Sequence, residues 1–311
     1  MSLIKRTSSF YRRGFLFPIL LIFLSCATVS TVNPVSEGAF AAELPAISFP
    51  AIETIVPVWH EVEEGIGYLN GRILRPQLEF WAIKIDLDSP DIRIVVSGGE
   101  AGESGTLSTK VSSFVRDNNL IAGLNATPFD VSTAVEGQPI RNMGIIVSDG
   151  RQIARANQQY DALVFFKPES PEQNGNAAIM RQSEIGSVTE EIENAIGGFH
   201  KILAGGEVAQ RTEGREDRHP RSAAGVSANG RILYLLVIDG RRAGSAGATE
   251  KETALLLQAL GSYDGINFDG GGSSALALRY PDGTVQTVNT PVHGGIPSRE
   301  RAVAGSIGVT R

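Results

Sequence analysis

The feature that most constrains the fold is an unbroken apolar run at residues 232–238. A continuous apolar run of this length predicts a strand that is buried on both faces of a sheet. The run stops abruptly at Asp239-Gly240, and a second short strand is expected at residues 265–268, where it stops at Asp269. Any fold of this chain must therefore bury two strands that each lead into an aspartate.

A helix is predicted between these two strands. Thr249 and Glu252 have the spacing of a capping box, and Gly261 is a natural C-terminal stop. The helix is therefore expected at about residues 250–260. A strand, a helix and a strand in this order predict a right-handed crossover between two parallel strands.

The rest of the chain adds mostly short strands. Residues 78–87 and 92–96 are rich in β-branched and aromatic side chains and flank a Ser-Pro turn, so they are expected to pair. A short helix is expected at residues 110–117, and further strands are expected at residues 120–124, 144–147, 163–166 and 202–203. The predicted fold class is α+β or α/β, with a mixed, largely buried β-sheet and few helices in a single domain at residues 52–311.

The N-terminus predicts export. Lysine and arginine residues precede an apolar run at residues 14–24, which is the pattern of a signal peptide and is shorter than the roughly 20 residues of a membrane-spanning helix. Cys26 follows the run as in bacterial lipoproteins, so residues 1–26 are predicted to be a signal peptide of lipoprotein type, with lipidation at Cys26. Soluble secretion and an uncleaved anchor are the alternatives.

Residues 27–51 are small, polar and interrupted by prolines, and they predict a flexible linker. The expected location is the cell envelope, as a membrane-anchored lipoprotein, or otherwise the periplasm or the medium. Contact with the membrane is expected only through the N-terminal lipid or signal anchor.

Charge and composition exclude several classes of protein. The formal net charge is −6 and no long basic run is present, which argues against nucleic-acid binding. A single cysteine and four histidines without His-x-x-x-His spacing exclude a disulfide framework and the familiar helical zinc site. No metal site or cofactor is evident, and calcium is not excluded, because its oxygen ligands leave no compact signature outside EF-hand-like loops.

The two strand ends suggest where chemistry occurs. If the predicted parallel strands are neighbours, Asp239 and Asp269 lie at the same sheet edge, where open α/β sheets bind ligands. Their carboxylates would then approach the separation of roughly 5 to 9 Å found in pairs that cleave glycosides. Gly270, Gly271 and Gly272 lack a Cβ and can turn several N–H groups toward an anion or a sugar oxygen, and Ser273 adds a hydroxyl.

The same residues resemble a known family. Residues 266–275, Ile-Asn-Phe-Asp-Gly-Gly-Gly-Ser-Ser-Ala, are similar to the Asn-x-Asp-Gly-Gly-Gly-Ser signature of the phosphodiester glycosidases, the family of the mannose 6-phosphate uncovering enzyme. The resemblance extends to Pro-Arg-Ser-Ala-Ala-Gly at residues 220–225, to residues 237–241 and 288–291, and more weakly to Asn125 with Phe129. At residues 301–305 the chain departs from the family pattern, with Ala and Gly where Pro and Asn are common.

This resemblance implies a hydrolase that cleaves the bond between the anomeric carbon of a sugar and a phosphodiester. Together with the export predicted from the N-terminus, it leads to the hypothesis of an exported enzyme that acts on phosphate-bearing glycans or exopolysaccharide. The implied catalytic residues are Asp269, Asp239 and Arg221, with Arg221 holding the phosphate through its planar fork. The implied substrate-binding residues are Asn125, Asn267, Gly270, Gly271, Gly272, Ser273 and Asn289. The expected partner is a phosphate-linked carbohydrate.

Other interpretations of these residues stay open. Asp239-Gly240 is also an ordinary turn at a strand end, Arg221 is also an ordinary surface ion-pair partner, and Asn125 is also a cap. At the level of the whole protein, the alternative to an enzyme is a noncatalytic cell-surface protein that binds phosphoglycan. A serine esterase that uses Ser273 is a third possibility.

Overall fold

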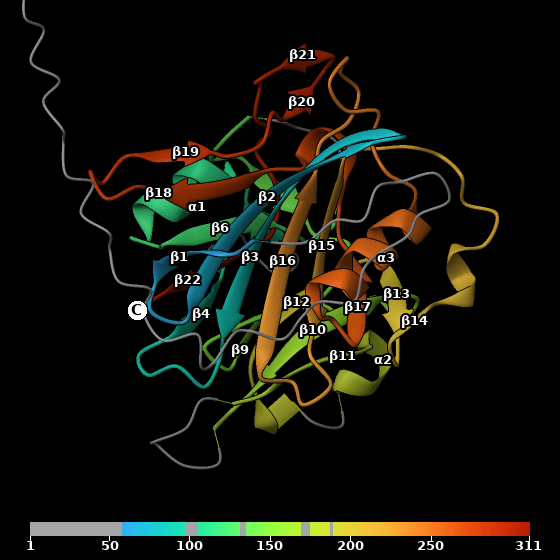
Figure 1. Cartoon of the computed structure of the whole chain (residues 1–311). Helices are drawn as coiled ribbons and strands as arrows, with labels where there is room; N and C mark the ends of the chain where they lie inside the picture. The colour runs from blue at the N-terminus through green and yellow to red at the C-terminus, as the bar shows by residue number, and fades with distance from the viewer. Residues whose placement is uncertain (1–57, 98–104, 131–134, 169–174, 187–188) are drawn as a thin grey trace, which may run out of the picture. The chain divides into compact units, whose positions relative to one another are not determined.

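Antiparallel strands account for most of the regular secondary structure in the described residues (Figure 1). The computed structural model describes residues 58–97, 105–130, 135–168, 175–186 and 189–311. The predicted signal peptide, the lipidation site Cys26 and the linker lie outside these residues. The described residues all belong to one compact unit, Leu44–Arg311.

The eight-stranded sheet has the order β1-β2-β3-β16-β15-β17-β13-β14. Its strands are β1 (His60–Glu63), β2 (Ile66–Leu74), β3 (Gln77–Asp86), β16 (Ile232–Ile238), β15 (Arg221–Val226), β17 (Asp264–Asn267), β13 (His200–Ala204) and β14 (Glu207–Val208).

Two five-stranded sheets and two two-stranded sheets complete the described β structure. The second sheet contains, in order, β11 (Ala177–Arg181), β10 (Asp161–Phe166), β12 (Ile192–Gly197), β8 (Ile146–Ser148) and β9 (Arg151–Ala154). The third contains β19 (Val285–Thr287), β18 (Leu276–Arg279), β6 (Ala122–Asn125), β22 (Ser306–Thr310) and β4 (Arg93–Val96). The two-stranded sheets pair β20 (Val292–His293) with β21 (Ile296–Pro297), and β5 (Gly105–Leu107) with β7 (Pro139–Arg141).

The described ranges contain three α-helices, α1 (Val111–Asp117), α2 (Gln182–Ile185) and α3 (Glu250–Leu260), and the 3-10 turns η2 (Thr189–Glu191), η3 (Gln210–Thr212) and η4 (Gly271–Ser273). Within the part of the chain that the structure describes, no helix is long and apolar enough to cross a membrane.

The predicted mixed sheet is wrong, because every ladder between two named strands is antiparallel. β16 and β17 run in the same direction, as predicted, but β15 lies between them and pairs with both. β15 is hydrogen-bonded to a strand on each side, and all six of its residues are buried. The two strands that lead into the aspartates are therefore not neighbours.

Helix α3 begins and ends as its sequence predicts. Thr249 Oγ1 accepts a hydrogen bond from Glu252 N at 3.1 Å, and Glu252 Oε2 accepts one from Thr249 N at 3.0 Å. Gly261 ends the helix with a φ of 106°, which a residue without a Cβ adopts readily. The buried face of α3 packs over β15, β16 and β17, as Figure 1 shows.

The strands predicted at residues 78–87 and 92–96 exist as β3 and β4, but the prediction that they pair is wrong. β3 lies between β2 and β16, and β4 pairs with β22 at the edge of the third sheet. The other predicted short strands appear as β6, β8, β10 and β13, and the predicted short helix is α1. Local composition thus identified the elements, whereas their pairing depends on the whole fold.

One apolar cluster joins the three larger sheets. It contains Leu235 of the eight-stranded sheet, Leu163 of the second sheet and Ile307 of the third, all with no exposed surface. The opposite face of the eight-stranded sheet is covered by α3 through a second cluster that includes Leu236 and Leu257. The eight-stranded sheet is therefore buried on both faces, as its continuous apolar strand predicts.

Candidate active site

The register of the eight-stranded sheet brings three of the sequence motifs to one end. Arg221, the first residue of β15, pairs with Ile238, and Ala223 pairs with Asn267. The start of β15 therefore lies between the residues that follow β16 and β17, which are Asp239 and Asp269. Two interstrand spacings of about 4.8 Å separate the ends of β16 and β17, so the expected close pair of carboxylates is not supported by strand adjacency.

Pro220 is packed between the two glycine turns. A Cβ on Gly240 would lie 2.7 Å from Pro220 N, and a Cβ on Gly270 would lie 2.7 Å from Pro220 O. Gly271 N also donates to Pro220 O at 2.9 Å. These contacts explain physically why glycine follows both aspartates, because any side chain there would displace the backbone of Pro220.

Asp269 is the carboxyl group best suited to chemistry in this region. Part of its surface is exposed, while protein atoms surround the rest closely. This burial raises the pKa of Asp269 to about 6, against the opposing effects of a hydrogen bond from Ser273, the positive charge of Arg301 and the Gly270 N–H. An acid with such a pKa exchanges its proton near neutral pH, as general acids and bases do.

Asn125 holds the Asp269 turn in place through buried hydrogen bonds. The side chain has 0% exposure. Its Nδ2 donates to Asp269 O at 2.7 Å, and its Oδ1 accepts from Ser222 Oγ at 2.6 Å and from Ala275 N at 3.1 Å. Asn125 was predicted to bind substrate, but both polar atoms of its side chain are hydrogen-bonded within the protein. Its contact with Asp269 is to the backbone carbonyl group.

Asp239 is enclosed as well, with 1% exposure. Its Oδ1 accepts from Asn289 Nδ2 at 3.0 Å and from Thr290 N at 3.1 Å, and its Oδ2 accepts from Arg242 Nε at 2.8 Å. Burial raises the pKa of Asp239, and these donors oppose the rise. Asp239 thus anchors residues 289–290 to the end of β16, which fits the structural interpretation of its Asp-Gly turn.

Asn289 completes this anchor. Its Nδ2 also donates to Ser274 O at 3.1 Å, and its Oδ1 accepts from Leu276 N at 2.9 Å. All of these contacts fix the backbone that follows the glycine turn. Asn289, like Asn125, supports the turn from the protein side.

Arg221 uses two of its three guanidinium nitrogens for hydrogen bonds within the protein. The residue is 9% exposed. Its Nε donates to Ala248 O at 2.9 Å and its Nη2 to Asp217 O at 3.0 Å, and its Nη1 lies 3.8 Å from Glu250 Oε1. These contacts use the planar fork within the protein and hold the loop before β15 against the start of α3.

Arg301 is the cation beside Asp269, and it was not among the predicted site residues. Arg301 Nη1 donates to Ser273 Oγ at 3.3 Å, and its Cζ lies 4.5 Å from the centroid of the Phe129 ring. Its charge lowers the pKa of Asp269. The only sequence signal was an arginine, in the segment Arg299-Glu300-Arg301, immediately before the apolar stretch at residues 302–304.

Further cationic and imidazole side chains surround the glycine turn. Arg241 Nη2 would lie 2.9 Å from a Cβ on Gly271, and it lies 3.5 Å from His219 Nδ1. His293 Nδ1 would lie 3.2 Å from a Cβ on Gly272. Burial lowers the pKa of both histidines, and neighbouring arginines lower it further. The fixed positive charge at the turn therefore comes from arginine.

The two remaining predicted residues lie close to the turn. Ser273 is buried, and its hydroxyl contacts Asp269 and Arg301; no histidine hydrogen-bonds to it within the described ranges. Asn267 is buried on the face of β17 that α3 covers, and its Oδ1 has no partner among the described residues. In the same part of the chain, no group of three or more His, Cys, Asp or Glu side chains is arranged to hold a metal ion.

Comparison with known proteins adds independent information. The family model for phosphodiester glycosidases matches residues 118–310. A hypothetical protein from Synechocystis matches with a TM-score of 0.60 and 17% identity, covering 81% of this chain and 63% of the other. The zebrafish N-acetylglucosamine-1-phosphodiester alpha-N-acetylglucosaminidase catalytic domain, auto-inhibited by its pro-peptide, matches with a TM-score of 0.60 and 18% identity, covering 81% and 85%.

These two structural matches concern the fold, because their identities are low. The chain spans less than two thirds of the Synechocystis protein. No curated protein sequence matches the chain. The family match itself contains all the residues from Asn125 to Arg301 described above.

Proposed function

The chain belongs to the phosphodiester glycosidase family, and from this premise we propose that it hydrolyses the bond between the anomeric carbon of a sugar and a phosphodiester. The observation that carries the proposal is the Asp269 carboxyl group, with a pKa of about 6, beside the Arg301 cation and the glycine turn. A carboxyl group and an anion-binding surface in one place are what this reaction requires.

Arg301 and Arg241 are proposed to hold the phosphate. Both guanidinium groups lie at the glycine turn, where Arg301 donates to Ser273 and Arg241 lies beside Gly271. Arginine suits this role because it stays charged and donates two parallel hydrogen bonds. This assignment replaces Arg221, whose guanidinium is used inside the protein.

Asp269 is proposed to act in its ionised form. The phosphate monoester departs from the anomeric carbon with the bonding electrons. Water supplies the hydroxyl group of the free sugar, and the second proton of that water goes to the phosphate monoester or to solvent. Because a phosphate is already a good leaving group, the reaction needs a carboxylate that stabilises the oxocarbenium-like transition state and accepts a proton from water more than it needs an acid.

Asn125, Asp239, Asn289 and Arg221 are proposed as positioning residues. Asn125 binds the backbone of Asp269 directly, and the other three fix the segments that flank the glycine turn. Such a buried frame keeps the reacting groups in a fixed geometry.

The substrates proposed are phosphate-bearing glycans outside the cytoplasm, such as exopolysaccharide or wall polymers. Support comes from the sequence of the N-terminus, where the cationic and apolar segments and Cys26 favour export and lipidation.

The test is incubation of the full chain with a panel of sugar-1-phosphodiesters, with release of reducing sugar as the readout. Asp269→Asn should lower turnover at least about a thousandfold, while Asp117→Asn, the same chemical change on an exposed helix end, should leave it intact. Binding of the panel without turnover would instead support a noncatalytic phosphoglycan-binding protein, and fluorophosphonate labelling of Ser273 would support an esterase.

A further inference from the structure

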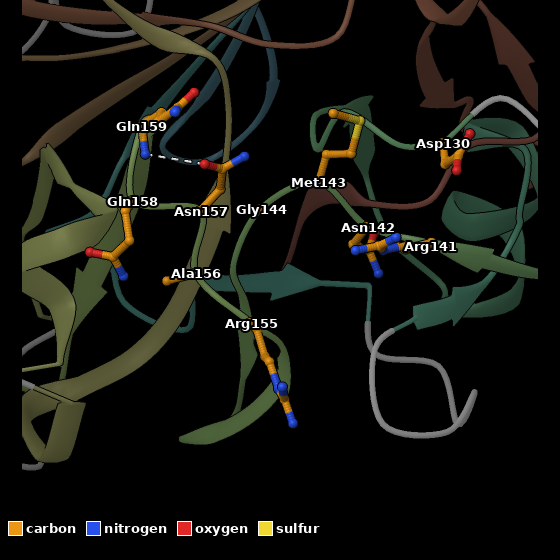
Figure 2. Close-up of a pocket in the computed structure, with 10 residues that line it drawn as sticks. All are labelled: Asp130, Arg141, Asn142, Met143, Gly144, Arg155, Ala156, Asn157, Gln158 and Gln159. Carbon is orange, nitrogen blue, oxygen red and sulfur yellow. Dashed lines mark hydrogen bonds between the residues drawn. The ribbon is translucent and has the colours of Figure 1, made fainter.

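A cavity lined by polar side chains lies near the candidate active site. Its volume is about 750 Å³, within the range of roughly 300 to 1,000 Å³ that is typical of ligand pockets. Figure 2 shows Arg141, Asn142 and Asp130 on one side and residues 157–159 on the other, with Arg155 below and between them. Asp269 is not part of the lining, so this cavity is separate from the reacting carboxyl group.

The segment 126–130 connects the cavity to the active site. Ala126 O accepts a hydrogen bond from Asp269 N at 2.8 Å, and Pro128 O accepts one from Met143 N at 2.8 Å. Phe129 forms a β-bridge with Asn142, and its ring lies under Arg301. One short segment therefore has the glycine turn on one side and the cavity on the other.

The walls of the cavity are held in place by a buried amide. Gln182 Oε1 accepts from Ile145 N at 2.9 Å and from Asn157 N at 2.8 Å, and Gln182 Nε2 donates to Asp161 O at 2.9 Å. Asn157 Oδ1 in turn accepts from Gln159 N at 3.1 Å, the dashed line in Figure 2. The cavity is thus preformed by bonds that use backbone groups and leave the Arg155, Gln158 and Gln159 side chains exposed.

The chemistry of the lining favours a hydroxyl-rich anion. Arg141 and Arg155 make no ion pair and no side-chain hydrogen bond within the described ranges, although the chain as a whole has a net charge of −6. Amide side chains donate and accept hydrogen bonds, as sugar hydroxyl groups do. The two guanidinium groups outnumber the single carboxylate of the lining, Asp130, so the cavity attracts an oxyanion.

We propose that this cavity binds a second sugar unit, one that carries a phosphate or a carboxylate and neighbours the cleaved bond in the same polymer. This inference rests on the proposed function, because it places the next unit of the substrate beyond the phosphate that Arg301 holds. It specifies the substrate class as a polyanionic glycan in place of an isolated phosphodiester.

The test compares kcat/KM of the full chain on four compounds. These are a sugar-1-phosphodiester of methanol, a longer neutral oligomer, an oligomer with a second phosphodiester, and an oligomer with a uronic acid. The wild type should prefer an anionic oligomer over the neutral one by about tenfold or more, as expected for charge-assisted hydrogen bonds. The two anionic compounds distinguish a phosphate from a carboxylate.

Arg141→Gln and Arg155→Gln should each reduce that preference severalfold. Arg151→Gln is the matched control, because Arg151 is an exposed arginine on β9 that does not line the cavity. Equal kcat/KM for neutral and anionic oligomers in the wild type, or a preference that survives both cavity variants, would overturn the inference.

Turnover of the methyl compound separates this inference from the proposed function. If no compound is hydrolysed, the proposed function fails. Titration calorimetry with the neutral and anionic oligomers then tests whether the cavity binds an anionic sugar, independently of turnover. The inference is supported if the anionic oligomer binds more tightly than the neutral one and Arg141→Gln weakens that binding. Equal affinity for the two oligomers overturns it.

Discussion

At the scale of single residues, the candidate site contains two kinds of charged side chain. Some are partly exposed to solvent, and others are hydrogen-bonded to protein groups and keep the surrounding backbone in place. Asp269 and Arg301 are partly exposed and interact electrostatically. Asp239 and Arg221 are the same two residue types, but their polar atoms are bonded to protein. A charged residue at a strand end can therefore be structural or reactive, and the difference depends on how many of its hydrogen bonds the protein supplies.

The pH dependence of activity should report Asp269. Since the proposed active form is ionised and the pKa is about 6, kcat/KM should rise with pH through about 6. Arg301→Met removes a charge that lowers this pKa, so the rise should move to higher pH while kcat/KM falls about tenfold or more. Arg301→Lys should keep the rise near its original pH. Activity that falls with pH over this range would show that Asp269 acts as an acid.

The stability of the protein should also depend on this group. The folded-state pKa of Asp269, about 6, lies above the ordinary value of 3.8, so the folded state holds its proton more tightly than the unfolded state. The contribution is present below pH 4 and is lost as pH rises through 6, by about 3 kcal/mol from this residue. Urea unfolding at pH 4 and pH 7 measures it, and Asp269→Asn should remove that part of the pH dependence.

The residues of the candidate site were predictable from sequence only where a local pattern required them. The glycine signature identified Asp269 and the turn. Glycine is required at position 270 whatever the substrate, because a side chain there would meet the backbone of Pro220. Arg301 was not predicted, because it reaches the turn through tertiary structure from near the C-terminus. Arg221 carried the expected chemistry in sequence, but the carbonyl groups that bind it come from distant loops.

At the scale of elements, β15 determines the arrangement of the site. Its six residues, Arg-Ser-Ala-Ala-Gly-Val, lack the β-branched pattern that marks strands in a sequence, and they form a buried strand because neighbours on both sides supply its hydrogen bonds. Helix α3 was predictable to the residue, because its cap and stop are local signals. Pairing order was not, because it depends on which strands share a core.

The glycine turn should tolerate no side chain at Gly270. Gly270→Ala would place a Cβ 2.7 Å from Pro220 O, a backbone atom, and should lower the free energy of unfolding by about 1 to 3 kcal/mol with loss of turnover. Gly186→Ala is the control, because a Cβ there meets nothing within 4 Å. Equal denaturant midpoints for the two variants would contradict the packing described for Pro220.

At the scale of the whole molecule, the three larger sheets share one apolar core, and Asn125 links two of them. It lies at the end of β6 in the third sheet and accepts a hydrogen bond from Ser222 of β15 in the eight-stranded sheet. The site therefore forms only when both sheets are in place. Folding of these sheets is expected to be cooperative.

Loss of the Asn125–Ser222 hydrogen bond should lower the stability of the whole described domain. Asn125→Ala leaves Ser222 Oγ, Ala275 N and Asp269 O without their partner, and should lower the free energy of unfolding by about 3 kcal/mol in a single transition. Asn70→Ala, on an exposed position of β2, should change it by less than about 0.5 kcal/mol. Two separate transitions in the wild type would show that the sheets fold independently.

The bonds made by Gln182 have a consequence for how such a protein diversifies. The three groups that Gln182 binds are all backbone atoms, at Ile145, Asn157 and Asp161, so they persist whatever side chains the adjoining positions carry. Arg155, Gln158 and Gln159 are exposed on this fixed backbone and are free to drift or to be randomised in a library. New specificities are therefore accessible by exchanging these side chains, while the fold and the Asp269 turn are inherited unchanged.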